Sequence, residues 1–207
     1  MFYRIVRPLL YLFMCLFYPH KVYGKENLPE CQQVVVCNHF GKIDVFFVGS
    51  LYKNKTYFLA KKELFENKLS NKIVRSLGGI PVKRDGVDLE CIKEGLKVLK
   101  NGDNLAIFPE GRRNRENDDL QPLKPGSAMF AFKAKVPIVP VILEKKAHAF
   151  RRCNMLVGKP IYLDEYYGRT YNAELADEMN QKLTEAMLQT QADLRAMLKE
   201  KRERKRK

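Results

Sequence analysis

Two side chains with complementary acid–base chemistry lie five residues apart in the segment VVVCNHFGKIDVFF. His39 follows a short β-branched run, and Asp44 begins a new apolar segment. A neutral imidazole can take a proton from a hydroxyl at neutral pH, and a carboxylate on its other nitrogen fixes the tautomer and stabilises the imidazolium. This is the base and orienting group of a serine-hydrolase triad without the serine, so the nucleophile could be a hydroxyl of the substrate. A capping Asp beside an unrelated surface His is the alternative interpretation.

Two later segments combine arginine or lysine with glycine, a composition that suits the binding of anions. They are LGGIPVKRDG and LAIFPEGRRNR, and their candidate residues are Lys83, Arg84, Glu110, Gly111, Arg112 and Arg113. A planar guanidinium can donate two parallel hydrogen bonds to a phosphate. Each segment alone is equally consistent with a solvated basic loop, and Glu110 could pair with one of the arginines that follow it.

The whole chain is strongly basic, which indicates an anionic partner. Its 207 residues include 38 Lys and Arg against 24 Asp and Glu, a formal charge of +14. Nucleic acid, a phospholipid surface, an acidic protein or a phosphorylated substrate would all suit this charge. The five cysteines are scattered without a Cys-x-x-Cys pair, so we expect no disulfide framework, no zinc or other metal site, and a reducing cytoplasmic environment.

The elements that must position these side chains alternate between strand and helix. Short β-branched or apolar runs predict strands at residues 33–37, 56–59, 105–108 and 138–143. Pro140 interrupts the last of these runs. Apolar residues at helical spacing predict helices at 87–100 and 173–198. This alternation favours one α/β domain over residues 21–198, followed by a basic tail at 199–207.

The first 20 residues predict a short helix that lies in a membrane interface. An apolar and aromatic run covers residues 8–18, which is 11 residues and too short to span a bilayer, where about 20 are needed. Arg4, Arg7 and Lys21 flank this run, as expected for a helix lying among lipid headgroups, and Pro8 suits its first turn. A helix buried in the protein core is the alternative.

Four short motifs, taken in order, resemble those of the PlsC-type glycerophosphate and lysophosphatidate acyltransferases. The first is Asn38-His39 with Asp44, which matches the family's Asn-His-x-x-x-x-Asp box, and GKENLP precedes it. The second is GGIPVKR with Arg84 in the arginine position, the third is FPEGRRN, and the fourth is VPIVPV. The resemblance covers roughly residues 23–160.

This chain departs from the family pattern in two motifs. Phe40 and Gly41 stand where a polar residue and Ser usually follow the His, so a contact made by that Ser is absent or supplied by backbone. Arg112 and Asn114 replace the usual Thr and Ser of the third motif. The additional charge of Arg112, beside Arg113, could reach a substrate phosphate, a carrier protein or only solvent.

The resemblance implies an acyltransferase built as a single α/β domain, with a mixed β-sheet flanked by helices. In this family the His takes a proton from a hydroxyl of a glycerol phosphate backbone, and that hydroxyl attacks an acyl thioester. His39 would therefore be the base and Asp44 its orienting carboxylate. The residues expected to bind the acceptor and its phosphate are Arg84, Glu110, Gly111 and Arg113, with Arg112 and Lys83 as further candidates.

The expected reaction acylates the sn-2 hydroxyl of 1-acylglycerol 3-phosphate and gives phosphatidate. The expected partners are lysophosphatidate, acyl-CoA or acyl carrier protein as donor, and a phospholipid surface at the cytoplasmic face of the membrane, with no cofactor and no nucleic acid. Another lysolipid or hydroxyl-bearing acceptor is an open alternative for the same chemistry. From other classes, a basic nucleic-acid-binding module would explain the charge, and an inactive membrane scaffold would explain the fold.

Overall fold

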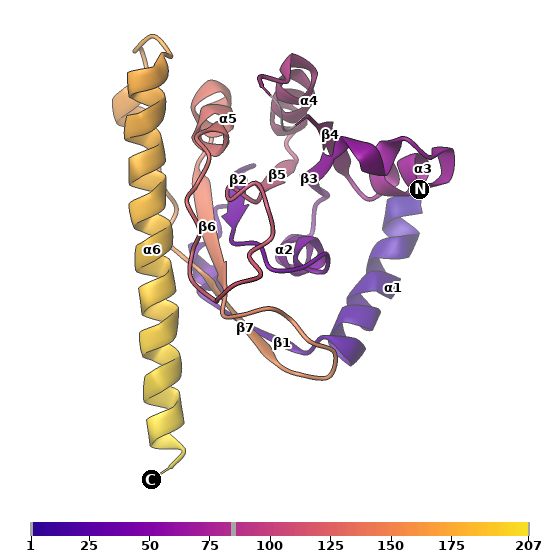
Figure 1. Cartoon of the computed structure of the whole chain (residues 1–207), viewed down its shortest axis with the longest axis vertical. Coiled ribbons are helices and arrows are strands. Elements are labelled where there is room, and N and C mark those ends of the chain that lie inside the picture. Colours follow the sequence, from indigo (N-terminus) through magenta and orange to yellow (C-terminus); the bar gives the residue numbers. More distant parts are fainter. Residues whose placement is uncertain (1, 84–85, 207) are drawn as a thin grey trace.

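A seven-stranded β-sheet in the order β1-β7-β6-β2-β5-β3-β4 forms the centre of the molecule (Figure 1). The computed structural model describes residues 2–83 and 86–206, so the predicted site residue Arg84 lies outside the described residues. The strands are β1 (His20–Tyr23), β2 (Val34–Cys37), β3 (Thr56–Lys61), β4 (Gly79–Val82), β5 (Asn104–Ile107), β6 (Ile138–Leu143) and β7 (Cys153–Val157). All neighbouring strands run parallel except β6 and β7, which are antiparallel. The predicted mixed sheet is confirmed.

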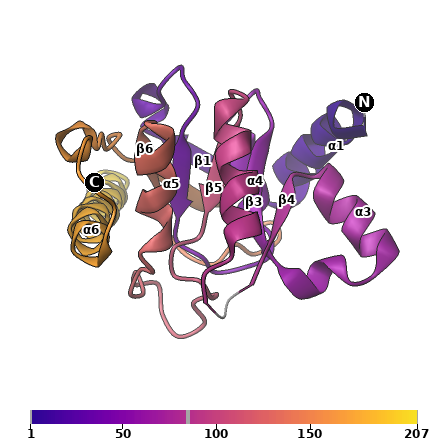
Figure 2. The ribbon, with the colours of Figure 1, turned by 90° about the horizontal axis from the view of Figure 1, so that it is seen from above.

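Helices cover both faces of this sheet. They are α1 (Phe2–Phe17), α2 (Asp44–Ser50), α3 (Lys68–Ser76), α4 (Leu89–Lys100), α5 (Gly126–Ala134) and α6 (Ala173–Arg204), with 3₁₀ turns η1 (Lys25–Asn27), η2 (Lys62–Phe65) and η3 (Asp164–Tyr166). Val34 and Val36 of β2 point into the core shared with α4, α5 and α6, while Val35 points into the core shared with α1 and α2. This alternation is what a strand buried on both faces requires. Figure 2 shows α4 and α5 side by side over one face.

The predicted strand at residues 138–143 has the observed bounds, the other three predicted strands are present with shifted ends, and three further strands were not predicted. β4 consists of GIPV from the motif that we interpreted only as an anion-binding loop. β1 and β7 pair with each other at one edge of the sheet, where short strands with partly exposed residues give a weak hydrophobic signal. The additional strands lengthen the sheet at both ends without changing its class.

Pro140 lies inside β6, so the predicted interruption of this strand is wrong. Its carbonyl oxygen accepts a hydrogen bond from the Gly158 N–H at 2.8 Å, on the side of β7. The N–H and C=O of one strand residue point to the same side, so the N–H that proline lacks would also face β7. The pairing of β6 with β7 ends at Val141 and Val157, one residue before Pro140. The missing N–H of Pro140 therefore lies beyond the end of this pairing and removes no hydrogen bond from it.

Side-chain caps set the start of two helices. Asp88 accepts a hydrogen bond from the Cys91 N–H, so α4 begins at Leu89 and not at residue 87. Asn172 accepts from the Leu175 N–H and caps α6. The apolar spacing of α6 ends near Leu198, but the helix continues to Arg204, because lysine, arginine and glutamate are good helix formers. Most of the predicted basic tail is thus helical.

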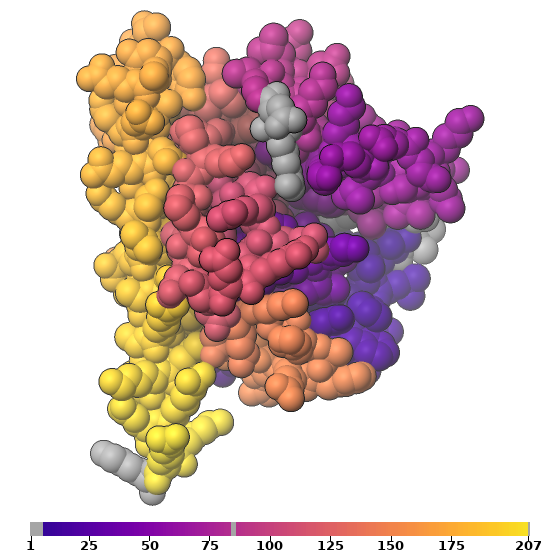
Figure 3. Space-filling view, in the orientation of Figure 1, coloured from indigo at the N-terminus to yellow at the C-terminus, as the bar shows by residue number. Residues whose placement is uncertain are grey.

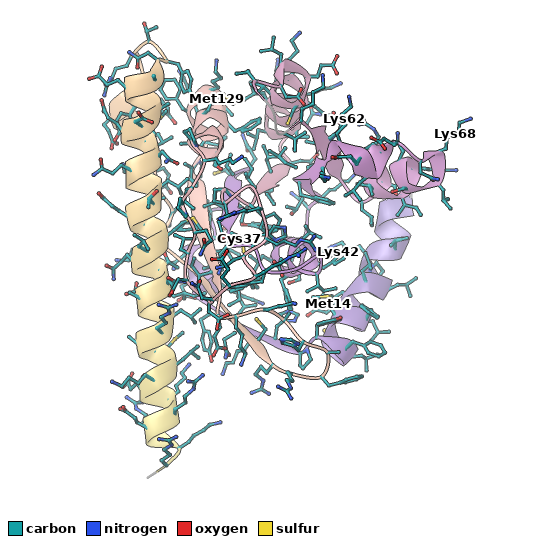
Figure 4. All side chains as sticks on the ribbon, in the orientation of Figure 1. Met14, Cys37, Lys42, Lys62, Lys68 and Met129 are labelled. Carbon is teal, nitrogen blue, oxygen red and sulfur yellow. The ribbon has the colours of Figure 1, made fainter. Side chains whose placement is uncertain are left out.

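Helix α1 packs one side against the domain and exposes the other. Met14, labelled in Figure 4, is 2% exposed and belongs to the core beneath α2, whereas Leu9, Leu12 and Leu16 are more than half exposed. The helix begins at Phe2, so Pro8 lies inside it and the prediction that Pro8 occupies the first turn is wrong. In the part of the chain that the structure describes, no helix combines the length and apolarity needed to cross a bilayer.

The carboxyl ends of β2, β5 and β6 meet at one edge of the sheet, and the site forms there. Beyond the end of β2, the Asn38 side chain continues the hydrogen bonding between β2 and β6. Its Nδ2 donates to the Leu143 carbonyl at 3.0 Å, and its Oδ1 accepts from the Leu143 N–H at 2.8 Å. Asn38 is 1% exposed, so these two bonds satisfy a buried amide. The next residue, His39, leaves the sheet at a fixed position.

Candidate active site

The His39 side chain is held by the turn that links β2 to α2. Its Nδ1 lies 2.9 Å from Oδ2 of Asp44, the first residue of α2. The same Oδ2 accepts the backbone N–H groups of Phe40 at 2.6 Å and Gly41 at 2.7 Å. Asp44 is fully buried, and its Oδ2 acts only as an acceptor. Nδ1 must therefore carry the hydrogen, which leaves Nε2 free to accept a proton.

The third motif holds the backbone of His39 from both sides. The His39 N–H donates to Oε1 of Glu110 at 2.9 Å, and the His39 carbonyl accepts the N–H of Asn114 at 2.6 Å. The imidazole also stacks on Phe108, with ring centroids 4.2 Å apart. Asn114 fixes its own loop by donating from Nδ2 to the Asp119 carbonyl at 2.7 Å. Residues 108–114 therefore fix both the ring and the backbone of His39.

Glu110 lies buried behind this turn, with 4% of its surface exposed. Burial raises the pKa of its carboxyl to about 7, although hydrogen bonds from the backbone N–H groups of His39 and Gln121 lower it. Its second oxygen has no hydrogen-bond partner among the described residues. The carboxyl supports the turn and is not among the described groups that line the cavity in front of His39.

His39 lines a largely apolar cavity of about 510 Å³. Its apolar wall comes from β3, β4, β5, α4, α5 and adjoining loop residues, and consists chiefly of Leu59, Val82, Val87, Ile92, Ile107, Phe108, Met129 and Phe130. Among the described residues, Lys61, Lys83 and Lys124 add positive charges to this lining, and Asp88 adds a negative charge. A cavity of this kind can enclose a hydrocarbon chain while its polar groups hold a charged head.

The predicted arginines of the third motif lie outside this cavity. Arg113 lines a second hollow, of about 540 Å³, on the other side of the His39 turn together with Lys42, Arg115 and Lys146. Three segments contribute to this hollow: residues 40–42, residues 113–118 and the loop of Lys146. Figure 3 shows the last two, in pink and orange, next to each other on the viewed face, and Figure 4 labels Lys42 beside α2. Arg112 is exposed. The structure brings His39, Gly111 and Lys83 to one cavity, with Asp44 buried behind His39, and places Arg113 apart from them.

Gly111 shapes the cavity because it has no Cβ atom. Its φ is 68°, a left-handed value that glycine adopts without strain. A Cβ atom at this position would lie 2.9 Å from Cε of Lys124, so the lysine stem crosses the space that a side chain would fill. The Lys124 N–H also donates to the Pro109 carbonyl at 2.8 Å. The start of the loop between β5 and α5 therefore positions a lysine from the end of the same loop.

Lys61, Lys124 and Ser127 line the cavity but were not among the site residues predicted from the sequence. Lys61 is the last residue of β3, at the same edge of the sheet as the ends of β2 and β5. The predicted strand ended at residue 59, which concealed this position. Lys124 and Ser127 flank the start of α5, a place where polar side chains often face a site.

Fold and site are those of an α/β enzyme in which a His–Asp pair faces an apolar cavity with cationic residues. The family model described as Acyltransferase matches residues 19–144, and the chain belongs to this family. The predicted resemblance to the PlsC type is confirmed by the relatives that follow.

Two bacterial relatives are both named 1-acyl-sn-glycerol-3-phosphate acyltransferase. The one from Bacillus subtilis (strain 168) is 31% identical over 175 residues, which cover 80% of this chain and 86% of the relative. The one from Streptococcus pneumoniae is also 31% identical over 175 residues, covering 80% of this chain and 64% of the relative. A crystal structure of the 1-acyl-sn-glycerophosphate acyltransferase PlsC from Thermotoga maritima superposes with a TM-score of 0.69 at 25% identity, over 93% of this chain and 79% of that one.

Proposed function

We propose that this acyltransferase moves a fatty acyl group from the thioester of acyl-CoA or acyl carrier protein to the sn-2 hydroxyl of 1-acylglycerol 3-phosphate, which gives phosphatidate. The observation that carries this proposal is the 2.9 Å contact between His39 Nδ1 and the buried Asp44, beside an apolar cavity with cationic residues. The names of the bacterial relatives support the choice of acceptor.

In the proposed reaction His39 is the general base. Nε2 takes the proton of the sn-2 hydroxyl while the hydroxyl oxygen attacks the carbonyl carbon of the thioester. Asp44 stabilises the imidazolium that forms, and its three hydrogen bonds keep the ring from turning. The tetrahedral intermediate then breaks its C–S bond, and the departing thiolate takes the proton back from Nε2. The ester, the free thiol and the neutral imidazole complete the cycle without a metal or an acyl-enzyme.

Several basic residues are proposed to bind the charged parts of the substrates. Lys83 lines the His39 cavity, and Arg84 follows it in the chain, so we assign this pair to the acceptor. Arg113 lines the second hollow and Arg112 is exposed, and both would bind a phosphate that reaches the turn from that side. Glu110 would act on the acceptor through the backbone of His39.

We also propose that the protein docks on the cytoplasmic face of the membrane through the exposed side of α1. Phe17, at the end of this helix, contacts Phe150 of the loop between β6 and β7, with ring centroids 5.4 Å apart, and Phe150 is 72% exposed. The same loop carries Lys146, Arg151 and Arg152, which suit anionic headgroups. An acceptor with a long acyl chain resides in a bilayer, so such docking would deliver it to the site.

Purified protein mixed with lysophosphatidate and either acyl-CoA or acyl carrier protein tests the reaction. We expect phosphatidate, identified by mass, with at least one donor, and the donor that supports turnover becomes the assigned one. Lysophosphatidylcholine and a monoacylglycerol serve as alternative acceptors in parallel. Transfer to one of these but not to lysophosphatidate would replace the proposed acceptor, and absence of transfer with every donor and acceptor would leave the scaffold hypothesis.

A further inference from the structure

We propose that the start of α5, together with Lys124 and Ser127, forms the subsite that binds the phosphate monoester of the acceptor. This inference rests on the proposed function and specifies which groups of the cavity recognise the charged head. It differs from the expectation drawn from the sequence motifs, in which the arginines of the second and third motifs alone hold the phosphate.

The first turn of α5 opens into the cavity that His39 lines. Lys124, Pro125, Gly126 and Ser127 all belong to the cavity wall. The first N–H groups of an α-helix have no partner within the helix, and Pro125 before this helix supplies no side-chain cap. These N–H groups and the positive end of the helix dipole favour an anion at this position.

Ser127 is an independent sign of a ligand at this helix start. The residue is 2% exposed, yet it lines the cavity. Among the described residues its hydroxyl has no hydrogen-bond partner. Its oxygen is not one of the fully enclosed atoms that lack a partner, so the hydroxyl is accessible from the cavity and can donate a hydrogen bond there. A phosphate oxygen in the cavity would supply the missing partner.

Lys124 supplies a positive charge at the same place. Among the described residues no carboxylate forms an ion pair with its ammonium group, whereas Lys61 in the same cavity pairs with Glu63 at 2.6 Å. The close approach at Gly111 holds the lysine stem against the third motif. The charge is therefore both unpaired and held close to the start of α5.

The space in front of the helix start is open. A Cβ atom built on Gly126 would meet no atom within 4 Å, so this glycine leaves room for a ligand atom close to the helix backbone. A phosphate monoester has three terminal oxygens, and these can accept from helix N–H groups, a hydroxyl and an ammonium at once. Since His39 lines the same cavity, a short glycerol backbone could place its hydroxyl at the imidazole and its phosphate at α5.

The test compares Lys124→Met and Ser127→Ala with wild type. Lys97→Met is the matched control, because Lys97 is exposed on α4 and makes no contribution to the cavity wall. We expect the KM for lysophosphatidate to rise about 10- to 100-fold in Lys124→Met and about tenfold in Ser127→Ala, with the KM for the donor unchanged. Lys97→Met should keep both constants. Thermal unfolding of each variant confirms that the fold is retained.

Two further arms identify the source of the phosphate. Acylation of a monoacylglycerol, which has no phosphate, should be equally fast in wild type and both variants. A rise in the KM for acyl-CoA instead of lysophosphatidate would assign the subsite to the donor and overturn the proposal. Equal loss for the acceptor with and without phosphate would overturn it as well.

Direct binding separates this inference from the proposed function. Titration calorimetry with glycerol 3-phosphate, which lacks the acyl chain, needs no turnover. We expect the Kd to rise at least tenfold in Lys124→Met, with Lys97→Met equal to wild type. If wild type showed this binding pattern but no acyl transfer to lysophosphatidate, the proposed function would fail and the subsite would stand. Equal affinity of wild type and Lys124→Met would remove the subsite, whatever the activity.

Discussion

The substitution Asp44→Asn tests the geometry of the turn most sharply, because it removes a charge and keeps the shape. Oδ2 of Asp44 accepts three hydrogen bonds, from His39 Nδ1, Phe40 N–H and Gly41 N–H. An amide can turn its oxygen to these three donors, so the turn should keep its conformation. Weaker hydrogen bonds to a neutral acceptor should lower the free energy of unfolding by about 1–3 kcal/mol.

The effect on catalysis should be larger than the effect on stability. When His39 becomes an imidazolium, its positive charge lies about 4 Å from the carboxylate charge, and at an effective dielectric constant of about 20 this pair contributes about 4 kcal/mol. Losing this stabilisation in the transition state lowers kcat by about 10³-fold. Asp193→Asn, on the exposed side of α6, removes the same charge far from the turn and should leave kcat unchanged.

The assay follows thiol release from the donor at saturating lysophosphatidate, with thermal unfolding measured on the same samples. A folded Asp44→Asn protein whose kcat stays within about threefold of wild type would refute the role of Asp44 as orienting carboxylate. A matching loss in Asp193→Asn would show that net charge, and not the His39 contact, controls the rate.

Three further predictions follow from the packing around the site and from α1. Burial raises the pKa of the Glu110 carboxyl to about 7, so its neutral form stabilises the fold below the unfolded pKa, and this stability is lost as the pH rises through 7. The melting temperature of Glu110→Gln relative to that of wild type should therefore rise between pH 5 and 8. A difference in melting temperature that stays constant over this range would contradict the burial argument. Gly111→Ala should lower the free energy of unfolding in urea by about 1–2 kcal/mol, because its φ of 68° is strained for alanine and a Cβ would displace the lysine stem beside it. The double substitution Leu12→Glu with Leu16→Glu should abolish sedimentation with anionic vesicles and leave the melting temperature unchanged, since both side chains are exposed; undiminished sedimentation would exclude α1 as the docking surface.

The central part of the fold was predictable from the sequence, and its edges were not. Val34 to Cys37 and Ile138 to Leu143 form buried strands whose apolar runs are unmistakable, because parallel strands covered on both faces have no polar alternation. The edge strand β4 contains Gly79 and Pro81, which are typical of turns, and its strand character depends on pairing with β3. Such pairing depends on residues far apart in the sequence.

The site divides in the same way. The contact of His39 with Asp44 is local, and the resemblance to the acyltransferase motif predicted it, whereas the spacing alone also allowed a capping Asp beside an unrelated His. The position of Arg113 was not predictable from the third motif. The chain turns sharply at Gly111, and Arg113 therefore lies on the far side of the His39 turn. The contact of Lys124 with Gly111 depends on how the long loop between β5 and α5 folds back on itself, which no local pattern in the sequence records.

The role of His39 as the base is the central claim, and His39→Ala tests it most directly. His148→Ala is the control, since His148 is exposed in the loop between β6 and β7. With lysophosphatidate and the donor that supports turnover, we expect wild type and His148→Ala to release thiol and form phosphatidate at equal rates. His39→Ala should be slower by at least about 10³-fold. Transfer by folded His39→Ala at the wild-type rate would contradict the account.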